Sequence, residues 1–150
     1  MKVFLDANVL FSASLSATGV GQALLVAAQK AGAGCISSEF AFGEARRNLG
    51  SKAPMSLRNL ELIEEIVLQV PEPGPAAVAA ARDAGVVVKD APVLAAALAG
   101  GADWFVTGDV RHFGHLFGQR VQGVLVLSLR AAVDALSAKA PQRAARGRAK

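Results

Sequence analysis

Short apolar runs alternate along the chain with longer segments in which apolar residues recur every three or four positions. The short runs predict strands at 2–5, 34–37, 103–108 and 121–128. The longer segments predict helices at 19–32, 37–49, 56–70, 75–85, 90–102 and 130–138, and the end of the third also suits a strand. Strands that alternate with helices favour parallel pairing through right-handed crossovers. We therefore expect an α/β fold, a three-layer sandwich with helices on both faces of a parallel sheet.

The charge distribution separates a folded body from a basic end. A chain of 150 residues suits a single domain. Its net charge of +4 is more than accounted for by five cations in residues 139–150, so the remainder carries a net charge of −1. We expect one domain over 1–138, followed by a basic, disordered and solvated tail over 139–150. A phosphate-binding arm is the alternative for the tail.

Two features bear on the cellular compartment. Residues 7–29 carry no charge, but serines, glycines and amides interrupt them too often for a membrane span or a secretory signal. The one cysteine, Cys35, has no partner for an intrachain disulfide and suits a reduced compartment. We therefore expect a cytoplasmic protein with no membrane segment.

Acidic residues stand at or near the ends of predicted strands. Asp6 directly follows the first strand, and Asp109 closely follows the strand at 103–108, so both belong at the carboxyl edge of the sheet. Asp90 opens a helix that a minimal loop would place at the opposite edge. On this argument it joins the other two only if residues 86–92 cross the sheet. Each of the three aspartates could instead be a helix N-cap.

Two glutamates compete for a place beside these aspartates. Glu44 is turned by about 100° from Ala45, a member of the buried stripe, so it lies at the margin of that stripe. Glu39 lies about 140° away from Glu44 around the helix, and it suits a first-turn acid that faces the helix dipole. We choose Glu44, although a glutamate at such a position is often simply solvated.

Four motifs together resemble a known family. DANVLFSA at 6–13, EARRNL at 44–49, DAPVLAAAL at 90–98 and TGDVRHF at 107–113 resemble, in this order, the PIN-domain ribonucleases and most closely the VapC-like toxins of type II toxin–antitoxin systems. The resemblance covers about residues 2–129. It implies a PIN-like three-layer α/β/α sandwich around a mainly parallel sheet. It also implies RNA as the substrate, a cognate antitoxin as a partner, and a homodimer.

Carried onto this sequence, the resemblance implies a set of site residues. The catalytic acids would be Asp6, Glu44, Asp90 and Asp109, with Asn8 and Thr107 as polar supports. Converging carboxylates suit Mg²⁺ (or Mn²⁺), which prefers oxygen ligands and can activate water for in-line attack on a phosphodiester. We expect Asp6, Asp90 and Asp109 to be the metal ligands, and we place most weight on Asp6 and Asp109.

Basic residues beside the motifs are candidates for contacts with RNA. Arg46 and Arg47 flank Glu44, and Arg111 and His112 follow Asp109, so each could touch the phosphate backbone, although solvated helix charges are the alternative for the two α-helical arginines. His112 and His115 lie three residues apart. With no second cysteine and no third histidine, the sequence does not favour a zinc site there.

Two other functions fit part of the pattern. A phosphohydrolase of the haloacid-dehalogenase type also has an aspartate after its first strand, but it normally has a second aspartate where this chain has Asn8. A non-catalytic PIN-like binding module is the other possibility. It would have no reason to gather carboxylates that repel one another.

Overall fold

The computed structural model describes residues 1–139. The predicted tail lies outside this range from residue 140 on, and Lys139 is the last residue of helix α8. The strands are β1 (Lys2–Leu5), β2 (Gly34–Ser38), β3 (Leu68–Val70), β4 (Trp104–Thr107), β5 (Arg120–Val121) and β6 (Val124–Ser128). The helices are α1 (Ala7–Leu15), α2 (Val20–Ala31), α3 (Glu39–Lys52), α4 (Leu57–Glu64), α5 (Pro75–Asp83), α6 (Ala91–Ala99), α7 (Val110–Phe113) and α8 (Leu129–Lys139), with short 3-10 turns η1 (Pro54–Ser56) and η2 (Gly114–Leu116).

The strands form one mainly parallel sheet in the order β3-β2-β1-β4-β6-β5. The central strand β1 pairs in parallel with β2 and β4, so that Val3 lies beside Cys35 and Trp104. Only the edge strand β5 among the described strands is antiparallel to its neighbour. The predicted α/β sheet is confirmed.

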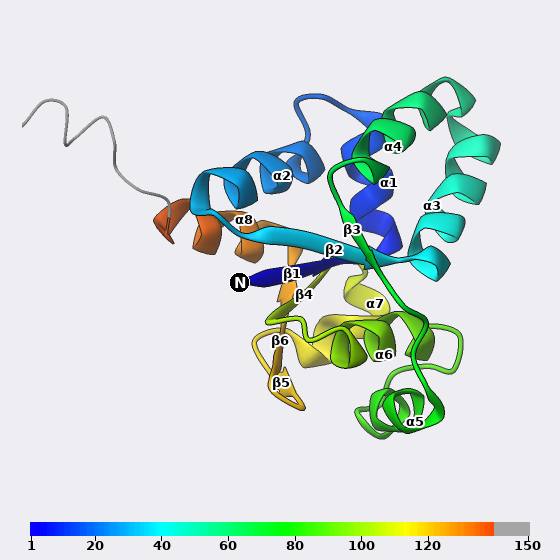
Figure 1. Ribbon diagram of the computed structural model, residues 1–150, viewed down its shortest axis with the longest axis vertical. Coiled ribbons are helices and arrows are strands. Elements are labelled where there is room, and N and C mark those ends of the chain that lie inside the picture. The colour runs from blue at the N-terminus through cyan, green and yellow to red at the C-terminus, as the bar shows by residue number, and fades with distance from the viewer. Residues whose placement is uncertain (140–150) are drawn as a thin grey trace, which may run out of the picture.

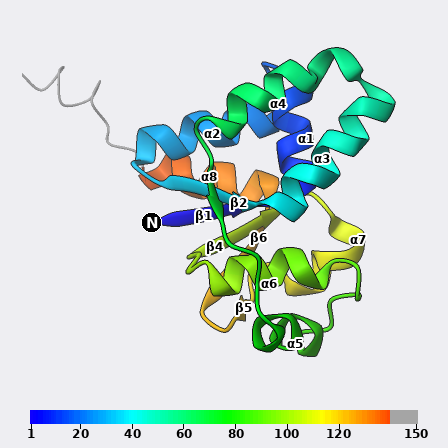
Figure 2. The ribbon, with the colours of Figure 1, turned by 45° about the vertical axis from the view of Figure 1, so that its right-hand side comes forward.

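Side chains alternate between the two faces of the sheet and build two cores. Val3 and Leu5 point into a core formed with α1, α2, α3, α4 and α8, whereas Phe4 points to the other face, into a core formed mainly with α6. Figure 1 shows α1–α4 and α8 above the sheet and α5, α6 and α7 below it, and the turned view in Figure 2 shows the same three layers. The predicted three-layer α/β/α sandwich is therefore confirmed.

Some elements differ from those that the sequence predicts. Residues 7–15 form an additional helix, α1, which periodicity does not reveal because apolar residues occupy several of its faces. The segment 56–70 divides into α4 and β3. The run 121–128 is interrupted after β5 by a two-residue turn at Gln122 and Gly123, both with positive φ, which reverses the chain into β6.

A close backbone approach fixes α1 against α2. A Cβ atom added to Gly21 of α2 would clash with the backbone nitrogen of Ala13 in α1 and would lie 2.8 Å from Ser12 Oγ. Glycine is therefore required at this crossing for steric reasons. Helix α1 begins directly after Asp6, so this contact also holds one wall of the site described below.

No single helix within residues 1–139 is long and apolar enough to cross a membrane. Helices α1 and α2 meet that test as a pair, but they are bent by 101° relative to each other.

Candidate functional site

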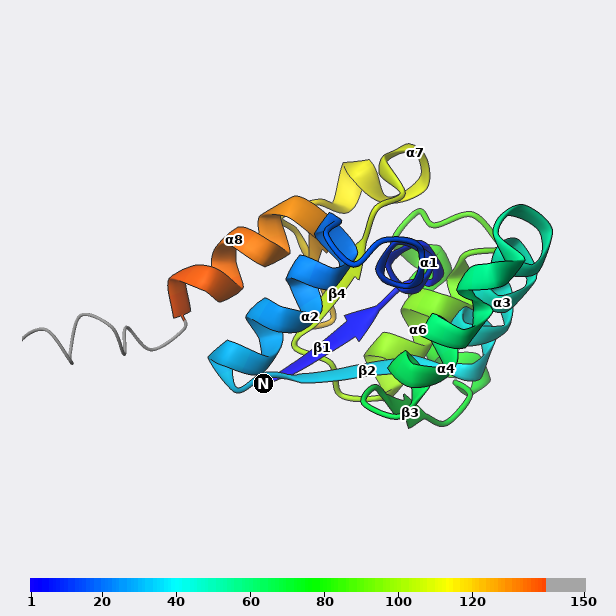
Figure 3. The same cartoon turned by 90° about the horizontal axis from the view of Figure 1, so that it is seen from above.

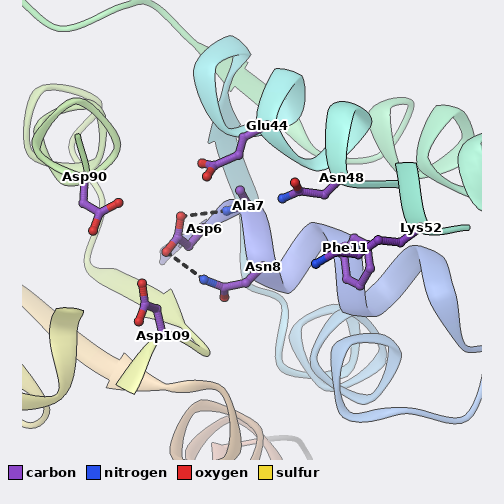
Figure 4. Close-up of a pocket in the computed structure, with 9 residues that line it drawn as sticks. All are labelled: Asp6, Ala7, Asn8, Phe11, Glu44, Asn48, Lys52, Asp90 and Asp109. Carbon is purple, nitrogen blue, oxygen red and sulfur yellow. Dashed lines mark hydrogen bonds between the residues drawn. The ribbon is translucent and has the colours of Figure 1, made fainter. Parts of the chain in front are cut away.

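Four carboxylates from four separate segments line one pocket of about 180 Å³ at the carboxyl edge of the sheet. Asp6 follows β1, Glu44 lies on α3, Asp90 precedes α6 and Asp109 follows β4. Figure 3, which views the molecule from above, shows α2 and α8 toward the left of the view and α1, α3 and α6 toward the right. In the close-up of Figure 4 the four acidic side chains point toward the same space.

Asp6 is the most buried acid of the group, with 5% of its surface exposed. Its Oδ1 accepts a hydrogen bond from Ala7 N at 2.7 Å, and its Oδ2 accepts from Thr107 Oγ1 at 2.7 Å and from Asn8 Nδ2 at 3.1 Å. Burial raises the pKa of Asp6 to about 6, hydrogen bonds from Thr107 and Ala7 oppose that rise, and the charges of Glu44 and Asp90 add to it. The carboxylate both precedes a helix and faces the pocket, so capping and ligand binding are compatible here.

Thr107 and Asn8 join the ends of β1 and β4 around this carboxylate. The fully buried Thr107 Oγ1 donates to Asp6 and accepts from Asp109 N at 3.0 Å. Asn8 Oδ1 accepts from Gly108 N at 2.6 Å, while its Nδ2 lies 3.2 Å from Thr107 Oγ1. Both residues therefore fix the position of acids at the predicted site.

Asp109 is tied to His112 by two contacts. Its Oδ1 accepts from His112 N at 3.1 Å as the N-cap of α7, and its Oδ2 lies 2.8 Å from His112 Nδ1. The histidine ring also lies 3.0 Å from Asp90 Oδ2. His112, which the sequence suggests as a possible contact for the RNA backbone, is thus directed at two of the carboxylates.

Asp90 reaches the pocket for a reason that the local sequence argument misses. Helix α6 precedes β4 and runs against it, so the start of α6 lies at the edge where β4 ends. The expectation that a minimal loop would put Asp90 at the opposite edge is therefore wrong, and no crossing segment is needed. Asp90 is also not a side-chain cap of α6.

One oxygen of Asp90 is buried without a partner. Asp90 Oδ2 accepts no hydrogen bond from the described residues, because the nearby His112 ring lacks hydrogen-bond geometry toward it. Burial raises the pKa of Asp90, with charges on His112 and Lys89 opposing the rise and Asp109 adding to it. A buried anionic oxygen without a donor is costly, and a bound cation is one way to offset that cost.

Glu44 lines the pocket from α3, and Asn48 and Lys52 line it from the same face of that helix. The spacing of four residues places these side chains one above another. Glu39, the rejected alternative, is exposed and forms an ion pair with Arg46 at 3.4 Å instead. Glu44 therefore lies with the three aspartates at the pocket, and Glu39 does not.

None of the three arginines that the sequence suggests as RNA contacts lines the pocket. Arg46 pairs with Glu39 and, at 2.9 Å, with Glu64 on the surface of α3 and α4. Arg47 and Arg111 are exposed and do not line the pocket. Lys52 is the one cation among the described residues that line it.

Four lining residues were not predicted as site residues from the sequence: Ala7, Phe11, Asn48 and Lys52. Lys52 Nζ lies 5.9 Å from the centre of the Phe11 ring, within cation–π range, so the two form a basic and aromatic wall opposite Asp90. Helical spacing from Glu44 could have revealed Asn48 and Lys52, because residues four and eight positions onward share its face.

The donor set fits a divalent cation. Ligand atoms of Asp90, Asp109 and His112 all lie within 4.8 Å of one another, and Asp6 and Glu44 face the same pocket. Carboxylate oxygens dominate the set, which suits Mg²⁺ or Mn²⁺. The unpartnered Asp90 Oδ2 is the independent observation that supports this fit.

The protein is an α/β protein whose acidic residues gather at the carboxyl edge of a mainly parallel sheet. A family model described as "PIN domain" matches residues 2–111, and the chain belongs to that family. A chain of VapBC2 from Rickettsia felis, solved bound to a promoter DNA fragment, has a similar fold, with a TM-score of 0.65 at 13% identity over 85% of this chain and 98% of that one. A chain of FitAB bound to an IR36 DNA fragment gives a TM-score of 0.56 at 20% identity over 85% and 94%. No curated protein matches the sequence.

Proposed function

We propose that this protein is a metal-dependent endoribonuclease, the VapC-like toxin of a toxin–antitoxin pair. The observation that carries the proposal is the meeting of Asp6, Glu44, Asp90 and Asp109 at one pocket, with one buried oxygen of Asp90 left unpartnered. The repulsion among four gathered carboxylates opposes folding, and a cation bound for catalysis would offset it. That argument also favours a nuclease over a PIN-like binding module.

Each residue has a distinct part in the proposed site. Asp6, Asp90 and Asp109 would hold Mg²⁺ or Mn²⁺, and when bound the ion supplies an activated water and neutralises charge on the phosphate. Thr107 and Asn8 keep the Asp6 carboxylate aimed into the pocket. Glu44 faces the same space from the opposite wall and is placed to orient a water molecule and accept its proton during in-line attack on phosphorus.

The shape of the pocket favours a polynucleotide over a small phosphate ester. Eight residues of α-helix separate Glu44 from Lys52, a rise of about 12 Å along α3. With one phosphate at the carboxylates, a strand could therefore place a neighbouring phosphate beside Lys52, a contact that a small ester lacks. Asn8, in turn, donates to Asp6 rather than serving as the second acid of a haloacid-dehalogenase-type enzyme.

The central experiment is an RNA cleavage assay with purified protein, in Mg²⁺, in Mn²⁺ and in EDTA. We expect cleavage of single-stranded RNA with either metal and none in EDTA, and no hydrolysis of p-nitrophenyl phosphate. Asp109→Asn protein purified in the same way controls for contaminating ribonuclease. Cleavage that survives exhaustive chelation would refute the metal mechanism, and hydrolysis of the small ester alone would favour the phosphohydrolase.

An antitoxin partner is part of the proposal, and an apolar groove supports it. The groove has a volume of about 340 Å³ and lies among α1, α2 and α4, where Val26, Leu62 and Ile66 are exposed. Exposed apolar patches of this kind mark protein contacts. The two structures of similar fold described above are those of VapBC2 and FitAB.

Co-expression tests the partner. We expect a neighbouring small reading frame to encode a protein that co-purifies with this chain and suppresses cleavage. Replacing Leu62 and Ile66 by glutamate should release that protein while leaving cleavage intact. Light scattering tests the proposed cytoplasmic homodimer, and a monomer that cleaves RNA at full rate would remove the dimer from the proposal.

A further inference from the structure

We propose that His112 is a nitrogen ligand of the metal ion, through Nδ1, alongside Asp90 and Asp109. This inference rests on the proposed function only in so far as it requires the pocket to bind a divalent cation. It replaces the phosphate contact that the sequence suggests for His112, and it adds a neutral ligand to an otherwise acidic set.

Two of the three distances among the donors suit neighbouring positions around one ion, and the two carboxylates have ligand atoms within 4.8 Å of each other. His112 Nδ1 lies 2.8 Å from Asp109 Oδ2 and 3.0 Å from Asp90 Oδ2. Ligands at right angles around an octahedral ion, each roughly 2.1 Å from it, are separated by about 3 Å. The ring nitrogen and the two oxygens therefore need little movement to share an ion.

The backbone around His112 holds the imidazole in place. His112 N donates to Asp109 Oδ1, so the residue that binds the ring also caps the helix that carries it. Side-chain exposure of His112 is 22%, which leaves the ring mostly enclosed between Asp90 and Asp109. His115, three residues on, instead contacts Ala84 O at 3.4 Å. The two histidines thus have different surroundings, and His115 serves as an internal control.

The unpartnered oxygen of Asp90 distinguishes a ligand site from a simple hydrogen-bonded cluster. The ring hydrogen on Nδ1 can be directed at Asp109 Oδ2, which leaves Asp90 Oδ2 without a donor. When an ion binds, the neutral ring carries its hydrogen on Nε2 instead of Nδ1, so Nδ1 and the two carboxylate oxygens can all turn their lone pairs to the same centre. The ion then provides Asp90 Oδ2 with the partner that the histidine alone does not supply.

A nitrogen ligand changes which metal the site prefers. Imidazole binds manganese and the later transition ions better than it binds magnesium, which takes oxygen ligands almost exclusively. The full-length protein should therefore bind Mn²⁺ more tightly than Mg²⁺, with His112 responsible for much of the difference.

Pulsed electron paramagnetic resonance of bound Mn²⁺ tests the ligand directly. We expect wild-type protein to show electron spin echo modulation from a directly coordinated ¹⁴N, His115→Asn to keep it, and His112→Asn to lose it. Mn²⁺ that binds wild type without nitrogen modulation overturns the inference and leaves the proposed ribonuclease standing. Modulation that persists in His112→Asn also overturns it. Failure of Mn²⁺ to bind at all removes both proposals.

Calorimetric titration provides the second readout. His112→Asn should weaken Mn²⁺ binding by about tenfold or more, at least as much as the loss of a residue that only orients a metal ligand. Mg²⁺ binding should weaken distinctly less. His112→Asp supplies an anionic oxygen ligand in place of the imidazole, so it should recover Mg²⁺ binding while losing the preference for Mn²⁺. Equal losses for both metals in His112→Asn, with a normal thermal melt, would show that His112 acts only by positioning Asp109.

Discussion

Thr107 Oγ1 donates a hydrogen bond of 2.7 Å to Asp6 Oδ2, across 101 residues of sequence and between the ends of adjacent parallel strands. The same hydroxyl accepts from Asp109 N. One buried oxygen thereby positions two of the four acids of the site. Its removal should affect stability as well as the arrangement of the carboxylates.

Replacing Thr107 by valine preserves the shape and removes the hydroxyl. The change leaves Asp109 N and one lone pair of Asp6 without their partner, so we expect a loss of about 1–3 kcal/mol in the free energy of unfolding. Urea denaturation measures it. Thr18→Val, at an exposed position, is the matched control and should change stability little. Equal effects of the two variants would contradict the role given to Thr107.

Asp6 should make the stability of the metal-free protein depend on pH. Its pKa is about 6 in the folded state, against an ordinary value of 3.8 for an aspartate. Between those values the folded state binds more protons than the unfolded state, so the free energy of unfolding falls as pH rises through this window. Relative to Asp6→Asn, wild type should lose on the order of 3 kcal/mol between pH 4 and pH 7.

The same pair of proteins tests metal binding. Asp6→Asn should lose cleavage, melt no lower than wild type without metal, and gain less stability from Mn²⁺, because an ion that binds the folded state stabilises it according to its affinity. Asparagine caps helices about as well as aspartate, so a purely capping Asp6 predicts little change in either property. Thermal melts with and without Mn²⁺ and an RNase assay decide, and a cleaving Asp6→Asn enzyme would displace the site.

Lys52 should contact the RNA backbone, and Arg46 should not. In an Asp6→Asn background that binds without cutting, Lys52→Gln should reduce the slope of log affinity against log salt concentration by about 0.7, the value for one phosphate contact with a single strand. Arg46→Gln should leave the slope unchanged, because Glu39 and Glu64 already pair with that side chain. Fluorescence anisotropy across a salt series measures both, and the reverse pattern would restore the arginine as the RNA contact.

Two glycines within helices should respond in opposite directions to alanine. Gly21→Ala forces a Cβ against the backbone of α1, so it should lower the melting temperature. Gly50→Ala in α3 meets no atom within 4 Å and should stabilise the protein by about 0.5–1 kcal/mol through reduced chain entropy. Differential scanning calorimetry compares them. A neutral Gly21→Ala would mean that α1 and α2 can separate at little cost.

The basic tail should contribute to RNA affinity without touching the site. Its residues from 140 on lie outside the described structure, so the prediction rests on charge: Arg143, Arg146, Arg148 and Lys150 can each release counterions from RNA. Deleting 140–150 should flatten the salt dependence of binding while metal affinity stays the same. An unaltered slope would leave the tail as a solvated end.

Alternation and periodicity predict most of the architecture, because strands and helices each impose a spacing on buried residues that can be seen in the chain. The turn at Gln122 and Gly123 escapes this reasoning, since apolar residues on both sides of it mimic one strand. Asp90 was misplaced by a local argument about loop length. The direction of a helix that precedes a parallel strand decides its position instead.

The site itself is only partly visible in the sequence. The four acids are suggested by the order of their motifs, whereas their meeting depends on strand order, which spacing does not encode. Lys52 and Phe11 come from different helices, and their contact appears only once α1 and α3 are packed. His112 was suggested as an RNA contact because it lies close to Asp109 in the sequence, whereas the geometry of α7 turns its ring toward Asp90 and Asp109.

The four segments that supply the carboxylates are spread from Asp6 to Asp109 of a 150-residue chain. A chain growing on the ribosome therefore lacks the last acid until more than two thirds of it has been made, and the central strand β1 lacks its neighbour β4 until the same point. If the protein does cut RNA, each newly made chain can become active only late in its own synthesis, after Asp109 and β4 have been added. A product that ends before β4 would lack both Asp109 and the strand that pairs with β1, so it should not cleave RNA.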